Sequence, residues 1–214
     1  MKTVWDNVEY FEDLIAEFAG SEFAVAVDSC TNALFLSMMY CKSSGVTTIE
    51  NKVNIPSRTY ISVPMQVRHA GFDVNFHTGY WSGAYQLEPL PVIDSAQRFT
   101  EGMYEFYEDS LYCLSFHSKK ILSIGRGGMI LTNDSNTRDW LKRSRYDGRS
   151  TLYYNEINNS TVPTLGWHMY MTPEEAVRGI EQFYKTPKNN KDSGCYDDYA
   201  VDLSELKCFD NATS

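Results

Sequence analysis

The stretch Ser115–Gly128, with the sequence SFHSKKILSIGRGG, places a hydroxyl, an imidazole and two lysines directly before a loop with three glycines. The apolar runs on either side, Leu111–Leu114 and Met129–Thr132, predict buried strands, so the lysines lie in a turn between strands. A lysine that is partly shielded from water can become a free amine, which attacks a carbonyl and forms a Schiff base. Adjacent lysines in a polar turn are equally typical of a solvated surface, and this stretch alone leaves both interpretations open.

A second segment favours the ligand-binding interpretation. In Pro91–Phe99, with the sequence PVIDSAQRF, an apolar strand of Val92 and Ile93 ends at Asp94, and Gln97 follows three residues later. Polar groups at the carboxyl ends of strands line the ligand crevice of open α/β sheets. An acid in such a crevice needs a cationic partner.

These two segments resemble the cofactor site of pyridoxal-phosphate nucleotide-sugar aminotransferases, the DegT/DnrJ-type branch of the aspartate aminotransferase (fold type I) superfamily. In that family the cofactor lysine lies five residues after the serine, which implies Lys120 rather than Lys119 as the catalytic residue. The family acid, followed three residues later by histidine or glutamine, matches Asp94 and Gln97. The resemblance implies that Asp94 keeps the pyridinium nitrogen protonated, and that Ser115 and Gln97 support the cofactor ring.

A polar turn near the amino terminus is a candidate phosphate cradle. Residues 29–32, SCTN, link a predicted strand, Phe23–Val27, to an apolar helix, Ala33–Tyr40. The start of a helix offers free backbone amides and the positive end of its dipole to an anion, although serine and threonine are also ordinary helix caps. The resemblance implies that Thr31 and Asn32 bind the cofactor phosphate.

Two further residues complete the predicted cofactor site. Tyr60 follows the predicted strand Val53–Ile55, and it matches an aromatic residue whose face packs on the pyridine ring in the family. A tyrosine packed in the core is the alternative. His168 lies in the segment Gly166–Phe183, which resembles the family segment that reaches the cofactor phosphate of the neighbouring subunit. The resemblance therefore implies a homodimer with shared active sites.

The expected fold is α/β, a three-layer sandwich with a mostly parallel central sheet, of the aspartate aminotransferase large-domain type. We expect a cofactor-binding domain over residues 1–185 and a polar linker with a short C-terminal tail over residues 186–214. The small C-terminal domain of the family is then largely absent. A strand-and-helix crossover of the family is also missing between His77 and Val92, where only a short connection remains.

Composition narrows the class of protein further. The net charge of −9 and a pI near 4.9 argue against a nucleic-acid partner, which demands a positive face. We expect no membrane span and no signal peptide, since no apolar run is long enough and acids occupy the amino terminus. The five scattered cysteines fit reduced thiols in a cytoplasmic protein, and neither they nor the histidines show metal-ligand spacing, so we expect no metal.

The resemblance implies a pyridoxal 5′-phosphate enzyme that transfers an amino group, with glutamate as the expected donor, to a nucleotide-linked keto-sugar. Lys120 would first bind the cofactor and then move a proton during the transfer. Two alternatives stay open: a pyridoxal-phosphate-binding homologue that has lost transaminase activity, and a related sugar dehydratase. The family dehydratases carry histidine at the lysine position, and the lysine at 120 argues against that alternative.

Overall fold

The structure is a computed structural model of the 214-residue chain, and it describes residues 5–46, 48–107, 109–150 and 157–209. The helices are α1 (Asp6–Ala19), α2 (Cys30–Ser43), α3 (Ser62–His69), α4 (Ser135–Ser144) and α5 (Pro173–Phe183). The strands are β1 (Phe23–Val27), β2 (Lys52–Pro56), β3 (Asp73–His77), β4 (Tyr85–Gln86), β5 (Val92–Asp94), β6 (Leu111–Ser115) and β7 (Gly128–Thr132). Short 3-10 helices are η1 (Ile49–Asn51), η2 (Tyr196–Asp198), η3 (Leu203–Glu205) and η4 (Lys207–Phe209). Within the described residues, no helix is both long and apolar enough to cross a membrane.

The central sheet has the order β1-β7-β6-β5-β4, and it is mixed rather than mostly parallel. Only β5 and β6 are parallel neighbours in this sheet, whereas the pairs β1/β7, β6/β7 and β4/β5 are antiparallel. The connections explain the difference from the sequence expectation. The lysine loop joins β6 to β7 without a crossover helix, and β4 reaches β5 through a short turn, so both pairs close as antiparallel neighbours.

The parallel pair β2/β3 forms a separate two-stranded sheet beside β4. It meets the segment after β4 at one antiparallel bridge, in which the amides of Asn54 and Glu88 each donate to the other's carbonyl, at 2.7 and 3.2 Å. The two-residue strand β4 lies in the segment where the sequence indicated a missing crossover. The two sheets therefore meet at one bridge, beside the ends of β4 and β5.

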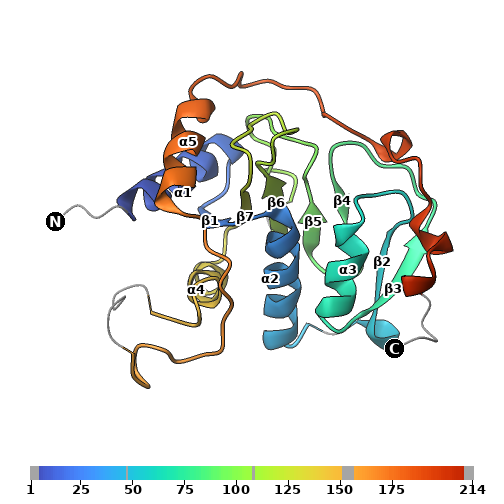
Figure 1. The fold of residues 1–214 in the computed structure, drawn as a ribbon, viewed down its shortest axis with the longest axis horizontal. Coiled ribbons are helices and arrows are strands. Elements are labelled where there is room, and N and C mark those ends of the chain that lie inside the picture. Colours follow the sequence, from blue (N-terminus) through green and yellow to red (C-terminus); the bar gives the residue numbers. More distant parts are fainter. Residues whose placement is uncertain (1–4, 47, 108, 151–156, 210–214) are drawn as a thin grey trace.

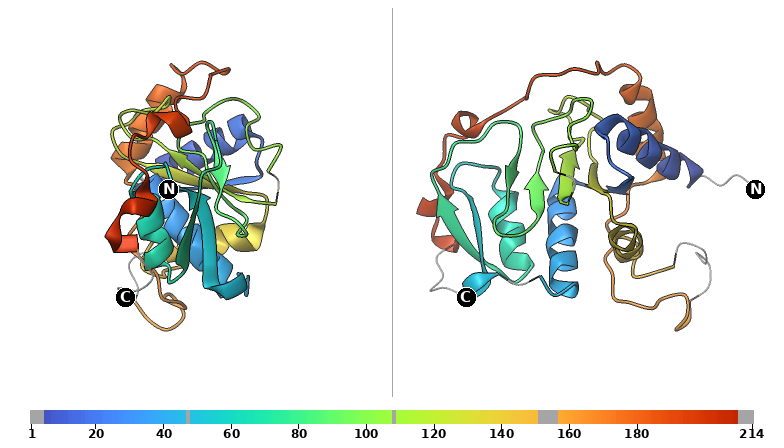
Figure 2. Two further views of the ribbon diagram at one scale, coloured as in Figure 1. Left: turned by 90° about the vertical axis from the view of Figure 1, so that its right-hand side faces the viewer. Right: turned by 180° about the vertical axis from the view of Figure 1, so that it is seen from behind.

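Helices cover both faces of the central sheet, which gives three layers (Figures 1 and 2). Alternate strand residues point to opposite faces, and two buried clusters result. One cluster joins β1, β5, β6 and β7 to α2, α3 and α4, with Val25, Leu34, Val67, Val92, Cys113 and Leu141 among its members. The other joins the same strands to α1 and α5, with Phe11, Ile15, Ala26, Leu114, Met129 and Ala176 among its members.

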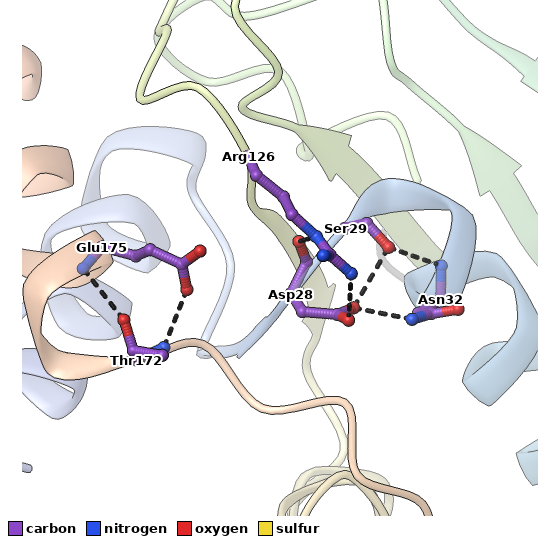
Figure 3. A network of polar contacts seen from close by, with 6 residues as sticks. All are labelled: Asp28, Ser29, Asn32, Arg126, Thr172 and Glu175. Carbon is purple, nitrogen blue, oxygen red and sulfur yellow. Dashed lines mark hydrogen bonds and ion pairs between the residues drawn. The ribbon is translucent and has the colours of Figure 1, made fainter.

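The helix boundaries follow from local capping. Ser29 and Asp134 accept hydrogen bonds from amides of the first turns of α2 and α4. At the start of α5, the Thr172 hydroxyl accepts from the Glu175 amide and the Glu175 carboxylate accepts from the Thr172 amide, a capping box (Figure 3). Helix α1 ends at Gly20, whose left-handed φ of 82° suits a residue without a side chain. These sequence signals mark the starts of α2, α4 and α5 and the end of α1.

The segment after α5 runs back across the molecule to the β2/β3 pair (Figure 1). Although the sequence reads as a polar linker, the segment is bonded to the domain along its length. The amide of Glu101 donates to the Lys188 carbonyl, the amide of Gly83 to the Gly194 carbonyl, and the Leu203 amide to the Ser57 carbonyl. We name residues 187–209 the C-terminal strap. Whether the chain divides into domains at residue 185 stays a prediction.

Candidate functional site

A cavity of about 510 Å³ lies where β5 and β6 end and α2 begins. Its wall combines residues from the start of the chain, the lysine loop and the C-terminal strap. Most of the predicted site residues line it, namely Thr31, Tyr60, Asp94, Gln97, Ser115 and Lys120. Asn32 and His168 are not among the lining residues.

The lysine loop presents its two lysines differently. Lys119 is exposed, whereas Lys120 is half-buried, and both line the cavity. A turn positions Lys120, because its amide donates to the His117 carbonyl at 2.9 Å, while the preceding Phe116 is fully buried and anchors the loop. Within the described residues the Lys120 ammonium makes no side-chain hydrogen bond or ion pair, so this amine is available to a ligand.

Asp94 ends β5 with only 5% of its surface exposed. One carboxylate oxygen accepts from the Ala96 amide at 2.9 Å, and the other accepts from the Tyr85 hydroxyl at 2.8 Å. Burial raises the pKa of Asp94, while the Ala96 amide, the Tyr85 hydroxyl and the charge of Lys120 act in the opposite direction. The Ala96 amide and the Tyr85 hydroxyl therefore stabilise the ionised form of Asp94, which burial disfavours.

Burial also acts on Lys120, where it lowers the pKa of the ammonium group, and the attraction of Asp94 partly opposes this shift. A lowered pKa increases the fraction of free amine near neutral pH. The cavity therefore holds a potential amine nucleophile together with a buried acid. An amine can form a Schiff base with an aldehyde, and an acid can pair with a protonated pyridine nitrogen.

The start of α2 forms one wall of the cavity. The Ser29 hydroxyl accepts from the Asn32 amide at 3.2 Å, and the hydroxyl oxygens of Thr31 and Ser62 lie 2.8 Å apart. The Asn32 side chain does not line the cavity and donates instead to the Asp28 carboxylate at 2.7 Å (Figure 3). Thr31 therefore lies in the predicted phosphate cradle. Asn32 instead holds the side chain of Asp28, the residue before Ser29.

Arg126, from the glycine loop, lies at the same wall and was not predicted from the sequence. Its guanidinium donates to the Asp28 carboxylate at 2.7 Å and to the Asp28 carbonyl at 3.2 Å (Figure 3). Its side chain is 65% exposed and lines the cavity. The pair connects the glycine loop to the turn before α2, and it places a cation at the edge of the cavity.

Gln97 and Tyr60 also line the cavity that holds Asp94. The Gln97 side-chain amide donates to the Tyr199 hydroxyl at 3.0 Å and accepts from the Ser193 hydroxyl at 2.9 Å, so Gln97 holds the C-terminal strap. Tyr60 is 59% exposed, which excludes the alternative of a tyrosine packed in the core. Its ring lines the cavity and is accessible to a ligand.

His168 is exposed, and its Nδ1 atom lies 3.2 Å from both carboxylate oxygens of Asp147. Its ring also contacts Tyr170 edge-on, at 4.8 Å between centroids. Since His168 does not line the cavity of its own chain, a role toward the cofactor would require a second subunit. That role stays a prediction.

The structure adds lining residues that sequence reasoning missed, namely Trp81, Tyr85, Arg126, Ser193, Asp198 and Tyr199. Trp81 packs against the rings of Tyr85 and Tyr199, at 4.9 and 5.7 Å between centroids. Two of these residues precede β5 in the shortened connection, and three come from the strap. No local motif marks them, although the unusual density of tyrosine and tryptophan around residues 80–85 was a usable signal.

The fold resembles solved sugar aminotransferases. PseC from Helicobacter pylori, an aminotransferase of pseudoaminic acid biosynthesis, is 18% identical with a TM-score of 0.63, and the match covers 84% of this chain and 57% of that one. CalS13, a sugar aminotransferase from Micromonospora echinospora, is 13% identical with a TM-score of 0.62, covering 84% and 61%. The GDP-4-keto-6-deoxymannose-3-dehydratase ColD is 14% identical with a TM-score of 0.63, covering 84% and 61%.

Among curated proteins, the spore coat polysaccharide biosynthesis protein SpsC of Bacillus subtilis is 25% identical over 224 aligned residues. The match covers 82% of this chain and 56% of SpsC, so the chain spans little more than half the length of that relative. The family match itself covers residues 2–78 and 107–209 and leaves out the segment that carries Asp94 and Gln97. The interruption includes β4 and β5. The matched residues nevertheless include the α2 turn and the lysine loop, and the chain belongs to the DegT/DnrJ/EryC1/StrS aminotransferase family.

Proposed function

We propose that the chain binds pyridoxal 5′-phosphate on Lys120 and transfers an amino group, with glutamate as the donor, to a keto-sugar carried on a nucleotide. One observation carries the proposal: the half-buried amine of Lys120 has no side-chain partner among the described residues, and it shares a cavity with the buried acid Asp94. Family membership and the likeness to solved sugar aminotransferases support the same reaction class.

The residues of the cavity fit this cofactor. Thr31 and the first amides of α2 offer donors to the phosphate, and the positive end of the helix favours the anion. Tyr60 offers an accessible ring face, and Asp94 offers a carboxylate to the ring nitrogen. When bound, the cofactor supplies a carbonyl carbon that condenses with amines and a ring that accepts an electron pair.

The chain's own groups then have distinct roles. Lys120 holds the cofactor until the substrate amine replaces it, and the released amine carries the proton away from the substrate carbon and back. Asp94 would keep the ring nitrogen protonated, while Ser115 and Gln97, which line the cavity, would support the ring. Lys119 and Arg126, two cations at the cavity, fit the negative charges of a nucleotide diphosphate.

We further propose that two copies form a homodimer in which His168 of each contributes to the other's site. His168 lies outside its own cavity, on a segment that also carries the Trp167 and Met169 side chains packed on the core. A symmetric dimer is the commonest arrangement in which one surface patch serves two sites.

Borohydride labelling tests the proposal. The full chain is incubated with pyridoxal 5′-phosphate, reduced with borohydride and digested for peptide mass spectrometry. We expect the label on Lys120, its complete loss in Lys120→Ala, and its retention in the matched control Lys119→Ala. A label on Lys119, or no specific label in the unsubstituted protein, contradicts the assignment.

A second measurement separates the proposed function from its alternatives. The cofactor-loaded protein is mixed with glutamate, and the 2-oxoglutarate released is counted per site. Release of one equivalent of 2-oxoglutarate per site supports amino transfer from glutamate. Cofactor binding without 2-oxoglutarate indicates the homologue that only binds the cofactor, and loss of water from a nucleotide keto-sugar would indicate a dehydratase, the activity named for the structural relative ColD.

A further inference from the structure

Tyr85 is the side chain that meets the buried acid of the cavity. Tyr85 begins β4 and is the register partner of Asp94 in β5, so the backbone pairing itself brings the two residues together. The Tyr85 hydroxyl donates to the Asp94 carboxylate at 2.8 Å. On its other side, the same hydroxyl lies 2.5 Å from the hydroxyl of Thr59, which is buried.

The three groups form a chain whose direction depends on the charge of Asp94. An ionised carboxylate can only accept, so Tyr85 must donate its single proton to Asp94, and Thr59 must then donate to Tyr85. If Asp94 is protonated, it can donate to Tyr85, and Tyr85 to Thr59. Burial raises the pKa of Tyr85, so the hydroxyl keeps its proton and remains a donor. The hydrogen bond from Tyr85 lowers the pKa of Asp94, so the direction in which Tyr85 donates stabilises the ionised acid.

The other titratable groups near Asp94 do not replace this donor. They come from α2, β6, the lysine loop and the strap, and are Cys30, Cys113, Lys120 and Tyr199. Burial raises the pKa of both thiols and of the Tyr199 hydroxyl, so these three groups stay neutral. Lys120 is the cation of the set, and its amine is committed to the cofactor in the proposed function. The lasting donors to Asp94 are therefore the Ala96 amide and Tyr85.

We propose that Tyr85 is a positioning residue that keeps the Asp94 carboxylate ionised and oriented toward the cofactor ring, with Thr59 fixing the direction of the Tyr85 hydroxyl. This inference rests on the proposed function. Tyr85 lies in the shortened connection, within residues that the family match leaves out. The same short strand that replaces a crossover therefore supplies the donor for the acid.

The test is the pH dependence of cofactor affinity, measured by the visible absorbance of the bound cofactor in the full chain. Affinity falls at acid pH as Asp94 gains a proton. Tyr85→Phe removes one hydrogen bond to the carboxylate, and we expect the acid midpoint to move up by about one pH unit. The matched control Tyr104→Phe removes a buried hydroxyl that donates to the Ser110 carbonyl at 2.9 Å, away from the cavity. That control should keep the midpoint of the unsubstituted protein.

A second pair of variants covers the case in which Tyr85→Phe does not fold. Thr59→Val removes the hydroxyl at nearly constant volume, and Thr59→Ser retains it. We expect a smaller upward shift for Thr59→Val and none for Thr59→Ser. Equal midpoints for Tyr85→Phe and the unsubstituted protein, or equal shifts for the two Thr59 variants, overturn this inference alone. No cofactor binding by the unsubstituted protein overturns the proposed function and this inference with it.

Discussion

Gly128 lies so close to the backbone of Ser29 that a Cβ atom on Gly128 would be 2.4 Å from the Ser29 carbonyl carbon. The first residue of β7 and the N-cap residue of α2 are therefore in direct backbone contact. Glycine is required here by this close approach. The contact brings the end of the lysine loop against the start of α2, the two segments that carry the Lys120 amine and the candidate phosphate cradle.

Gly128→Ala should weaken cofactor binding, because the new methyl group must push the start of α2 away from the lysine loop. We expect the dissociation constant to rise about tenfold or more, equivalent to about 1.4 kcal/mol. Titration of the visible absorbance measures this. Gly45→Ala is the control: it lies at φ +80° with no atom within 4 Å of the added carbon. That variant should lose about 1 kcal/mol of stability and keep its cofactor affinity; an equal loss of affinity would contradict the explanation.

Asp94→Asn should change how the stability of the cofactor-free protein depends on pH. The pKa of Asp94 is raised in the folded state, so the folded protein binds more protons than the unfolded chain above about pH 4. Stability is thus lost as the pH rises through the folded-state pKa. The asparagine variant lacks this loss and should gain stability relative to the unsubstituted protein as the pH increases. Urea unfolding at several pH values measures the difference, and a constant difference would refute the prediction.

Arg145→Met should destabilise the fold strongly. Arg145 follows the last residue of α4 and donates to the buried carboxylate of Glu12 in α1 and to the Ala26 carbonyl. Its removal leaves a carboxylate that is 3% exposed with only Lys142, at 3.0 Å, as a charged partner. Breaking a buried ion pair in this way typically costs about 3 kcal/mol. Urea unfolding gives the value, and Arg138→Met, at a partly exposed pair with Asp139, should cost less than about 1 kcal/mol.

Subunit mixing tests the shared site. Lys120→Ala and His168→Ala should each be inactive or strongly impaired alone. After exchange of subunits, one site of the mixed dimer has both residues intact, so part of the activity should return. Labelled subunits verify the exchange by sedimentation. Verified exchange without recovery, or an active monomer, would rule out a contribution of His168 across the interface.

Much of the fold could be predicted because the hydrophobic pattern and the caps act locally. The strand Phe23–Val27 agrees with β1 to the residue, and the Thr172-Pro173 start of α5 follows from capping chemistry. The direction of strands was not predictable in the same way. Whether β4 pairs parallel or antiparallel with β5 depends on the length of the connection in space, which a short insertion or deletion decides.

The candidate site likewise contains residues that local sequence predicts and residues that only the folded chain brings together. Asp94, Ser115 and Lys120 lie at strand ends or in a glycine loop, where sequence spacing indicates geometry, and they line one cavity. Tyr85 reaches that cavity through the antiparallel pairing of β4 with β5, and Tyr199 through a contact with Gln97, a residue far away in the sequence. Side chains whose position depends on tertiary pairing stay hidden until the chain is folded.

The C-terminal strap links ligand binding in the cavity to the docking of the strap on the rest of the domain. Ser193 and Tyr199 line the cavity and bind Gln97, so a ligand that touches them binds only the docked strap. By thermodynamic reciprocity, docking raises the affinity for that ligand by the same factor by which the ligand raises the docked population. Filling the cavity should therefore slow amide hydrogen exchange in the strap, for instance at Tyr196, whose amide donates to the Trp81 carbonyl. Hydrogen exchange in the C-terminal strap would then report whether a ligand occupies the cavity that contains Lys120.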